Sequence, residues 1–128
     1  MMKKTKLTGG EWDIYECLWE ESPLTLAQIR KRCSQRTGQA VSTVETVVSR
    51  MEKKGLFRVE QGERAKLFYP LLERGEAVRE ETRSFLDKIF GGSPLSMVNA
   101  MVDAGQLSDS DIDELYEMLG QAREKRHD

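Results

Sequence analysis

The sequence predicts a mainly α-helical protein with one small β-hairpin, and three observations lead to this fold class. Start signals of the type Thr/Ser-x-x-Glu/Gln precede several stretches in which apolar residues recur every three or four positions. Between residues 56 and 70 this period gives way to a short alternation rich in aromatic residues. Charge is divided unevenly, because residues 1–75 carry a net +4 and residues 76–128 a net −6. We therefore divide the 128-residue chain into residues 1–75 and residues 76–128.

Two helices are expected before residue 40. Residues 8–11 form a Thr-x-x-Glu capping box, which opens a helix over about residues 9–21 that ends before Pro23. A Thr-x-x-Gln box at residues 25–28 opens a second helix, which runs to about Arg36. The inward positions expected on these two helices are Trp12, Ile14, Tyr15, Cys17, Leu18, Trp19, Leu26, Ile29 and Cys33.

Cys17 and Cys33 are the only cysteines of the chain, and they lack the C-x-x-C spacing of metal and redox motifs. We expect them to be small core residues of a reduced, cytoplasmic protein, with a redox switch as the alternative.

Residues 41–55 predict a third helix with two different faces. Ser42 and Glu45 have capping-box spacing, and Gly55 provides the left-handed end. One face is expected to pack inward through Val44, Val47, Val48 and Met51.

The opposite face of this helix carries hydroxyl groups and cations. Thr43, Thr46 and Arg50 are expected to face the major groove of DNA, because arginine can bond guanine in bidentate fashion and threonine can contact a thymine methyl or a phosphate. A solvated surface is the alternative for such a face. Two short strands are expected next, over residues 56–60 and 65–69. Three helices followed by a basic hairpin is the order of elements in a winged helix-turn-helix. The residues expected to bind DNA are Ser42, Thr43, Thr46, Arg50, Lys53, Arg64 and Lys66.

The second part of the chain is expected to be helical throughout. Helices are predicted over about residues 73–90, 94–105 and 108–125, separated by Gly91-Gly92 and by the Ser108 capping position. These helices provide too few residues to cover one another's apolar faces, and large exposed apolar surface is typical of an interface. The alternative is that the helices pack on residues 1–75 of the same chain. The residues expected in a dimer interface are Phe85, Leu86, Ile89, Val98, Met101, Ile112, Leu115, Tyr116 and Leu119.

Catalytic and metal-binding patterns are not found in the sequence. His127 is the only histidine, and the acids of residues 109–114 lack the glycine and closing glutamate of a calcium loop. No run of about 20 apolar residues predicts membrane insertion, and the start of the chain has no apolar segment typical of a secretory signal. We expect no enzyme activity, no metal and no cofactor.

The order of motifs resembles the penicillinase repressor family, the winged-helix repressors of β-lactamase and methicillin-resistance operons. The resemblance rests on residues 7–12, residues 42–55, Phe68-Tyr69-Pro70 and the pattern of residues 107–116, and it covers nearly the whole chain. It implies a homodimeric repressor whose N-terminal domain binds a palindromic operator and whose C-terminal helices form the dimer.

The same resemblance implies a route of induction. In that family a membrane sensor-transducer triggers proteolysis within the helix after the Gly-Gly stop, which corresponds to Ala100-Met101. Well-known members have an Asn-Phe bond there, whereas here Asn99 lies one position away and Met101 replaces the aromatic residue. They also have lysine where this chain has Ser42, which implies a different operator sequence. The copper-responsive branch has a C-terminal cysteine pair that this chain lacks.

Our interpretation is a cytoplasmic, dimeric winged-helix repressor. Two alternatives remain open at this point. One is a winged-helix module that makes only protein contacts. The other is a ligand-sensing regulator with a pocket lined by Phe57, Tyr69 and Phe85.

Overall fold

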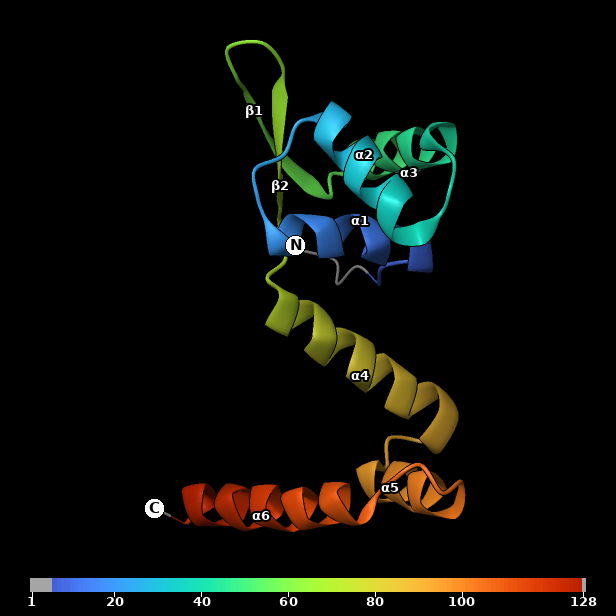
Figure 1. The fold of residues 1–128 in the computed structure, drawn as a ribbon. Coiled ribbons are helices and arrows are strands. Elements are labelled where there is room, and N and C mark those ends of the chain that lie inside the picture. The colour runs from blue at the N-terminus through green and yellow to red at the C-terminus, as the bar shows by residue number, and fades with distance from the viewer. Residues whose placement is uncertain (1–5, 128) are drawn as a thin grey trace. The chain divides into compact units, whose positions relative to one another are not determined.

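A computed structural model describes residues 6–127 and confirms the mainly helical fold with a two-stranded antiparallel hairpin (Figure 1). The chain forms two compact units, Met1–Thr82 and Arg83–Asp128, whose boundary lies inside the fourth helix. The division of functions at residue 75 stays a prediction. The elements are α1 (Gly9–Glu20), α2 (Leu26–Thr37), α3 (Val41–Lys53), β1 (Phe57–Gln61), β2 (Lys66–Pro70), α4 (Arg74–Phe90), α5 (Pro94–Asp103) and α6 (Asp109–Arg126).

The capping boxes expected for α1 and α2 are present. Thr8 Oγ1 accepts a hydrogen bond from the Glu11 N–H at 3.2 Å, and the Glu11 carboxylate accepts one from the Thr8 N–H at 2.9 Å. Thr25 and Gln28 make the same two bonds at the start of α2. These bonds satisfy N–H groups that the first turn of a helix leaves without a partner, so both helix starts follow directly from the sequence.

The start of α3 differs from the prediction. Ala40 is the N-cap residue and provides no side-chain bond, so the expected capping box of Ser42 and Glu45 is wrong. The chain leaves the left-handed turn at Gly38 in an extended conformation and enters the helix at Val41, which makes Ser42 the second helical residue. The Glu45 carboxylate lies 3.2 Å from the Arg30 guanidinium instead of reaching back to the first turn.

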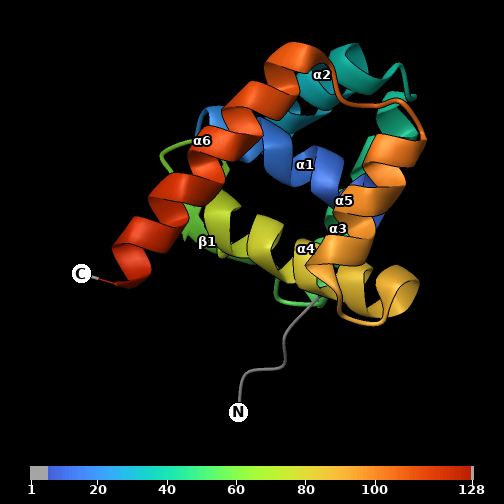
Figure 2. The same cartoon turned by 90° about the horizontal axis from the view of Figure 1, so that it is seen from below.

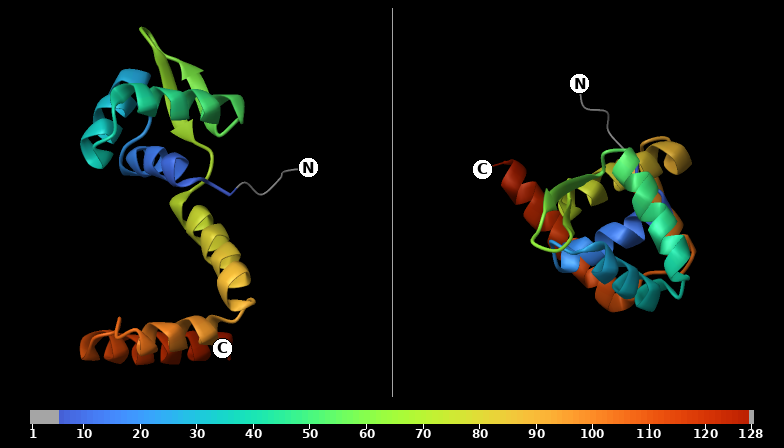
Figure 3. Two further views of the ribbon diagram at one scale, coloured as in Figure 1. Left: turned by 90° about the vertical axis from the view of Figure 1, so that its right-hand side faces the viewer. Right: turned by 90° about the horizontal axis from the view of Figure 1, so that it is seen from above.

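The hairpin is joined to the helices by a contact that the sequence did not predict. In the antiparallel register, Phe57 pairs with Pro70 and Val59 with Phe68. On the outer edge of β2, the Phe68 N–H donates to the Leu24 carbonyl at 2.8 Å and receives a bond from the Leu24 N–H at 3.2 Å. The connection between α1 and α2 therefore forms a third, one-residue strand, and α2, α3 and the hairpin surround α1 (Figure 3).

The core of the first unit is centred on α1. Tyr15 is fully buried, and its hydroxyl donates to the Leu56 carbonyl and accepts a bond from the Leu71 N–H at 3.4 Å. Because these two residues precede β1 and follow β2, one side chain holds both ends of the hairpin. Phe57 is only 8% exposed and packs its ring edge against Phe68 at 5.1 Å between centroids. Phe57 is therefore part of the core of the first unit, and the ligand pocket considered above stays a prediction.

The second unit contains helices with exposed apolar sides. Gly91 and Gly92 adopt positive φ angles after α4, and the Ser93 hydroxyl caps α5 by accepting from the Ser96 N–H at 3.1 Å. Ser108 and Asp111 form a capping box at α6. Within this unit, α5 and α6 run in different directions from their short connection (Figure 2). In the described part of the chain, no helix is both long and apolar enough to cross a membrane.

Candidate nucleic-acid interface

Helix α3 separates its two kinds of side chain as the sequence predicted. Val44, Val48 and Met51 are buried against the core, and Val47 is half-buried. The polar positions on the other side are exposed, namely Ser42, Thr43, Thr46, Ser49, Arg50 and Lys53. The buried valines fix the rotation of the helix, so the hydroxyl and basic side chains point into solvent from a rigid support.

The Thr46 hydroxyl has a partner within the helix. Its Oγ1 donates to the Ser42 carbonyl, four residues earlier, at 3.0 Å. This bond holds the hydroxyl against the helix backbone and fixes the χ1 angle of the side chain. Thr46 can therefore offer its methyl group and a remaining lone pair to a partner, but not its hydroxyl proton.

The basic side chains of the first unit differ in whether they already have an ion-pair partner. Lys66 Nζ lies 3.0 Å from Glu52, and Arg58 pairs with Glu60 while lying 3.7 Å from the centre of the Tyr69 ring. By contrast, no carboxylate within residues 6–127 forms an ion pair with Lys31, Arg50, Lys53 or Arg64. These four cations occupy the exposed sides of α2 and α3 and the turn of the hairpin. They are the side chains most ready to bind an anion, because no carboxylate has to be displaced first.

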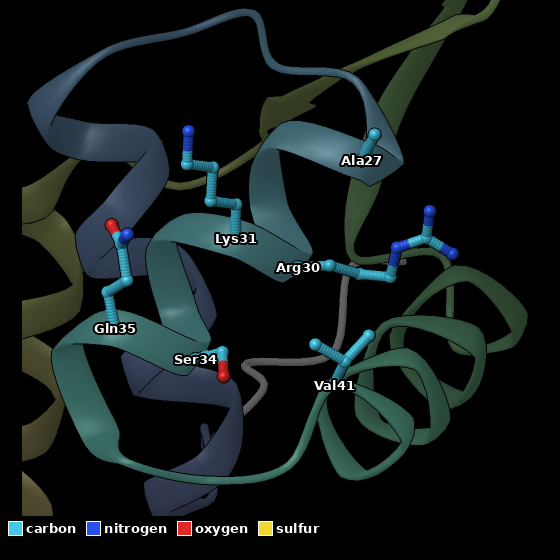
Figure 4. A pocket seen from close by; sticks show the side chains of 6 residues that line it. All are labelled: Ala27, Arg30, Lys31, Ser34, Gln35 and Val41. Carbon is cyan, nitrogen blue, oxygen red and sulfur yellow. The ribbon is translucent and has the colours of Figure 1, made fainter.

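A shallow hollow lies between α2 and the start of α3 (Figure 4). It has a volume of about 430 Å³, and Arg30, Lys31 and Val41 are among the residues that line it. Figure 4 shows Arg30 and Lys31 extending from α2 in different directions, with Val41 at the start of α3. The sequence analysis did not include Lys31 among the expected DNA-binding residues. Its position on the polar side of the helix before α3 could have indicated it.

One buried carboxylate joins α1 to the end of α3. Glu11 is 3% exposed, and its Oε2 lies 2.6 Å from Nζ of Lys54, the residue that follows α3. Burial alone would raise the pKa of Glu11, but the hydrogen bonds from Lys54 and Thr8 and the charge of Lys54 outweigh it, so its pKa lies below the ordinary 4.5. The pair therefore stays ionised near neutral pH and fixes the end of α3 to the core.

The apolar residues expected in a dimer interface are largely uncovered in the second unit. Phe85, Ile89, Met101, Tyr116 and Leu119 are exposed, with Tyr116 as high as 75%. The other predicted positions, Leu86, Val98, Ile112 and Leu115, are half-buried. Contacts within the unit include the Phe85 and Phe90 rings, whose centroids are 5.8 Å apart.

Comparisons of sequence with known proteins indicate one family. A sequence model of the penicillinase repressor family matches residues 7–121. The penicillinase repressor of Bacillus licheniformis is 24% identical to this chain over 98% of both proteins. The methicillin resistance regulatory protein MecI of Staphylococcus aureus is 22% identical over 91% of this chain and 95% of its own length. The solution structure of the DNA binding domain of the repressor BlaI superposes with a TM-score of 0.51 and 20% identity, covering 59% of this chain and 93% of that domain, which is a likeness of fold.

Proposed function

The chain belongs to the penicillinase repressor family, and from this premise we propose that it is a dimeric repressor that binds a palindromic DNA operator. Its relatives are transcriptional repressors and not enzymes, which agrees with the expectation from the sequence. The observation that carries the proposal is the exposed face of α3, where hydroxyl groups and unpaired cations project from a buried valine support.

Each part of this surface has a distinct proposed role. Helix α3 enters the major groove with the side chains of Ser42, Thr43, Thr46, Arg50 and Lys53. Among them, Arg50 reads a base by bidentate hydrogen bonds. Arg64 at the hairpin turn and Lys31 on α2 contact phosphates on either side of the groove. Lys66 contributes less charge than Arg64, because Glu52 already partly neutralises it.

The dimer is proposed to form through the second unit. Its exposed apolar side chains require a cover, and a second copy of the chain provides a matching surface by two-fold symmetry. Two α3 helices related by that symmetry would then read the two halves of a palindrome.

We propose that the regulated genes belong to an antibiotic response, as the names of the penicillinase and methicillin-resistance relatives suggest. Release of the operator would follow cleavage near Ala100-Met101, triggered by a membrane sensor-transducer. Both residues are exposed on α5, and the Ala100 carbonyl accepts a helix-ending bond from the Ala104 N–H at 3.0 Å. A protease would therefore have to unwind the last turns of α5 before it could cut there.

The test is fluorescence anisotropy of the full chain against a pool of palindromic duplexes at two salt concentrations, together with sizing of the free protein. Selective, salt-sensitive binding by a dimer is expected, because phosphate contacts release counterions. A dimer that binds none of the duplexes at low salt would contradict the proposed DNA binding. The winged helix would then be a module that makes only protein contacts.

A further inference from the structure

The two cysteines of the chain lie against each other in the core. Cys17 on α1 and Cys33 on α2 have their sulfur atoms 3.3 Å apart, and each residue is 1% exposed. Both are free thiols. Their positions are 16 residues apart, so a bond between them would close a loop across the connection between α1 and α2.

The surroundings make the two sulfur atoms chemically different. The hydrogen bond with Cys33 lowers the pKa of the Cys17 thiol to about 7, although burial raises it, and the charge of Arg36 lowers it further. The same hydrogen bond and burial raise the pKa of Cys33, whose sulfur also lies 3.6 Å from the Asp13 carbonyl. Because the thiolate is the nucleophilic form, Cys17 is the more reactive partner.

We propose that Cys17 and Cys33 form a redox site in which a hydroperoxide converts the two thiols into a reversible intramolecular disulfide. The sulfur atoms already touch, so they must approach by only about 1.2 Å to reach a bonding distance of about 2.05 Å. This inference is independent of the proposed repressor function, because it concerns the core and requires no DNA.

The reaction balances in two steps. The Cys17 thiolate attacks one peroxide oxygen, a sulfur–oxygen bond forms, the oxygen–oxygen bond breaks, and the released oxygen leaves as water after taking up a proton. The Cys33 sulfur then attacks the Cys17 sulfenic acid, the disulfide forms, and the hydroxyl leaves as a second water with the Cys33 proton. Two thiols lose two electrons, and one hydrogen peroxide is reduced to two waters.

The experiment treats the folded full chain with a small excess of hydrogen peroxide and follows free thiols, intact mass and non-reduced peptides. We expect both thiols to disappear together, with a loss of two hydrogen atoms, a Cys17–Cys33 peptide link and full recovery with dithiothreitol. The oxidised protein should melt several degrees higher, because the bond restricts the unfolded chain. Thiols that persist until methionine is oxidised, or links between two chains, would overturn the proposal.

Two single variants test the assigned roles. In Cys33→Ser, the Cys17 sulfenic acid has no partner, so dimedone should trap it. In Cys17→Ser, the remaining Cys33 thiol should react several times more slowly than Cys17 does in Cys33→Ser, because the charge of Asp13 raises the pKa of Cys33, whereas the charge and hydrogen bond of Arg36 lower that of Cys17. Equal rates in the two variants would overturn the assignment of Cys17 as the attacking thiol. Should serine in the core prevent folding, as judged by circular dichroism, the peptide map of the unaltered chain still decides whether the bond forms.

Discussion

At the scale of single residues, Arg50 is the side chain on which base recognition is expected to depend. It projects from the last turn of α3, is exposed, and has no ion-pair partner within residues 6–127. We expect Arg50→Ala to cost about 1–3 kcal/mol on the preferred operator and to relax the preference at one base pair, as measured by anisotropy with matched and altered duplexes. Arg64→Ala is the matched control, because it should weaken all sequences alike and reduce the salt slope by about 1. Equal losses on operator and scrambled DNA for Arg50→Ala would contradict base readout.

A second prediction at this scale concerns the buried Glu11 carboxylate. Glu11→Gln keeps the capping bonds but removes the charge that faces Lys54, so we expect a loss of about 1 kcal/mol in the free energy of unfolding at pH 7. The folded-state pKa of Glu11 is depressed, so its stabilisation is present above the ordinary value of 4.5 and is lost as the pH falls through the lower folded value. Urea unfolding at pH 7 and at pH 3 should therefore show the difference shrinking in acid.

The control for this change is Glu21→Gln, which removes an ion pair with Arg32 whose two side chains are both well exposed. Exposed pairs contribute little, so this variant should lose less than about 0.5 kcal/mol. A loss for Glu11→Gln that stays constant with pH would show that packing, and not charge, accounts for it.

At the scale of elements, the start of α3 provides the sharpest test of helix geometry. Ala40 has the extended conformation of an N-cap but cannot accept a hydrogen bond, so Ala40→Ser should add about 1 kcal/mol of stability. Ser42→Ala should change stability by less than about 0.5 kcal/mol, because Ser42 lies inside the first turn and does not cap the helix. Thermal unfolding measures both variants. If Ser42→Ala were the damaging change, the helix would begin two residues later than described.

The same element shows why sequence patterns predict some features and miss others. The boxes at Thr8 and Thr25 were predictable because each bond joins residues three positions apart. Ser42 and Glu45 have the same spacing, but Gly38 sets an earlier start and Arg30, on another helix, attracts the Glu45 carboxylate. The Leu24 contact with Phe68 and the salt bridge of Lys66 with Glu52 were missed for the same reason, since both join distant segments. Local periodicity was enough to predict the exposed face of α3. Which cations lack an ion-pair partner could be learned only from the three-dimensional structure, because the partners lie on other elements.

At the scale of the whole molecule, net positive charge and exposed apolar surface lie mostly in different units. The first unit buries most of its large apolar residues and exposes cations on α2, α3 and the hairpin turn. The second unit buries little and exposes large apolar side chains on α4, α5 and α6. Association through the second unit, as proposed, would leave the cations of the first unit free to bind DNA.

Disruption of the proposed dimer should therefore weaken binding to a full operator without weakening binding to a half-site. Leu119 is 60% exposed on α6, and in a two-fold interface a lysine there would act twice, at about 1.5 kcal/mol or more for each lost leucine contact. Leu119→Lys should then raise the dimer dissociation constant at least about a hundredfold in sedimentation experiments. Gln121→Lys is the matched control, because it adds the same charge on the opposite side of the same helix.

In Leu119→Lys, affinity for the palindrome should fall while affinity for an isolated half-site stays unchanged, since the α3 surface is intact. An unaltered dimer, or equal losses on both duplexes, would contradict association through this face.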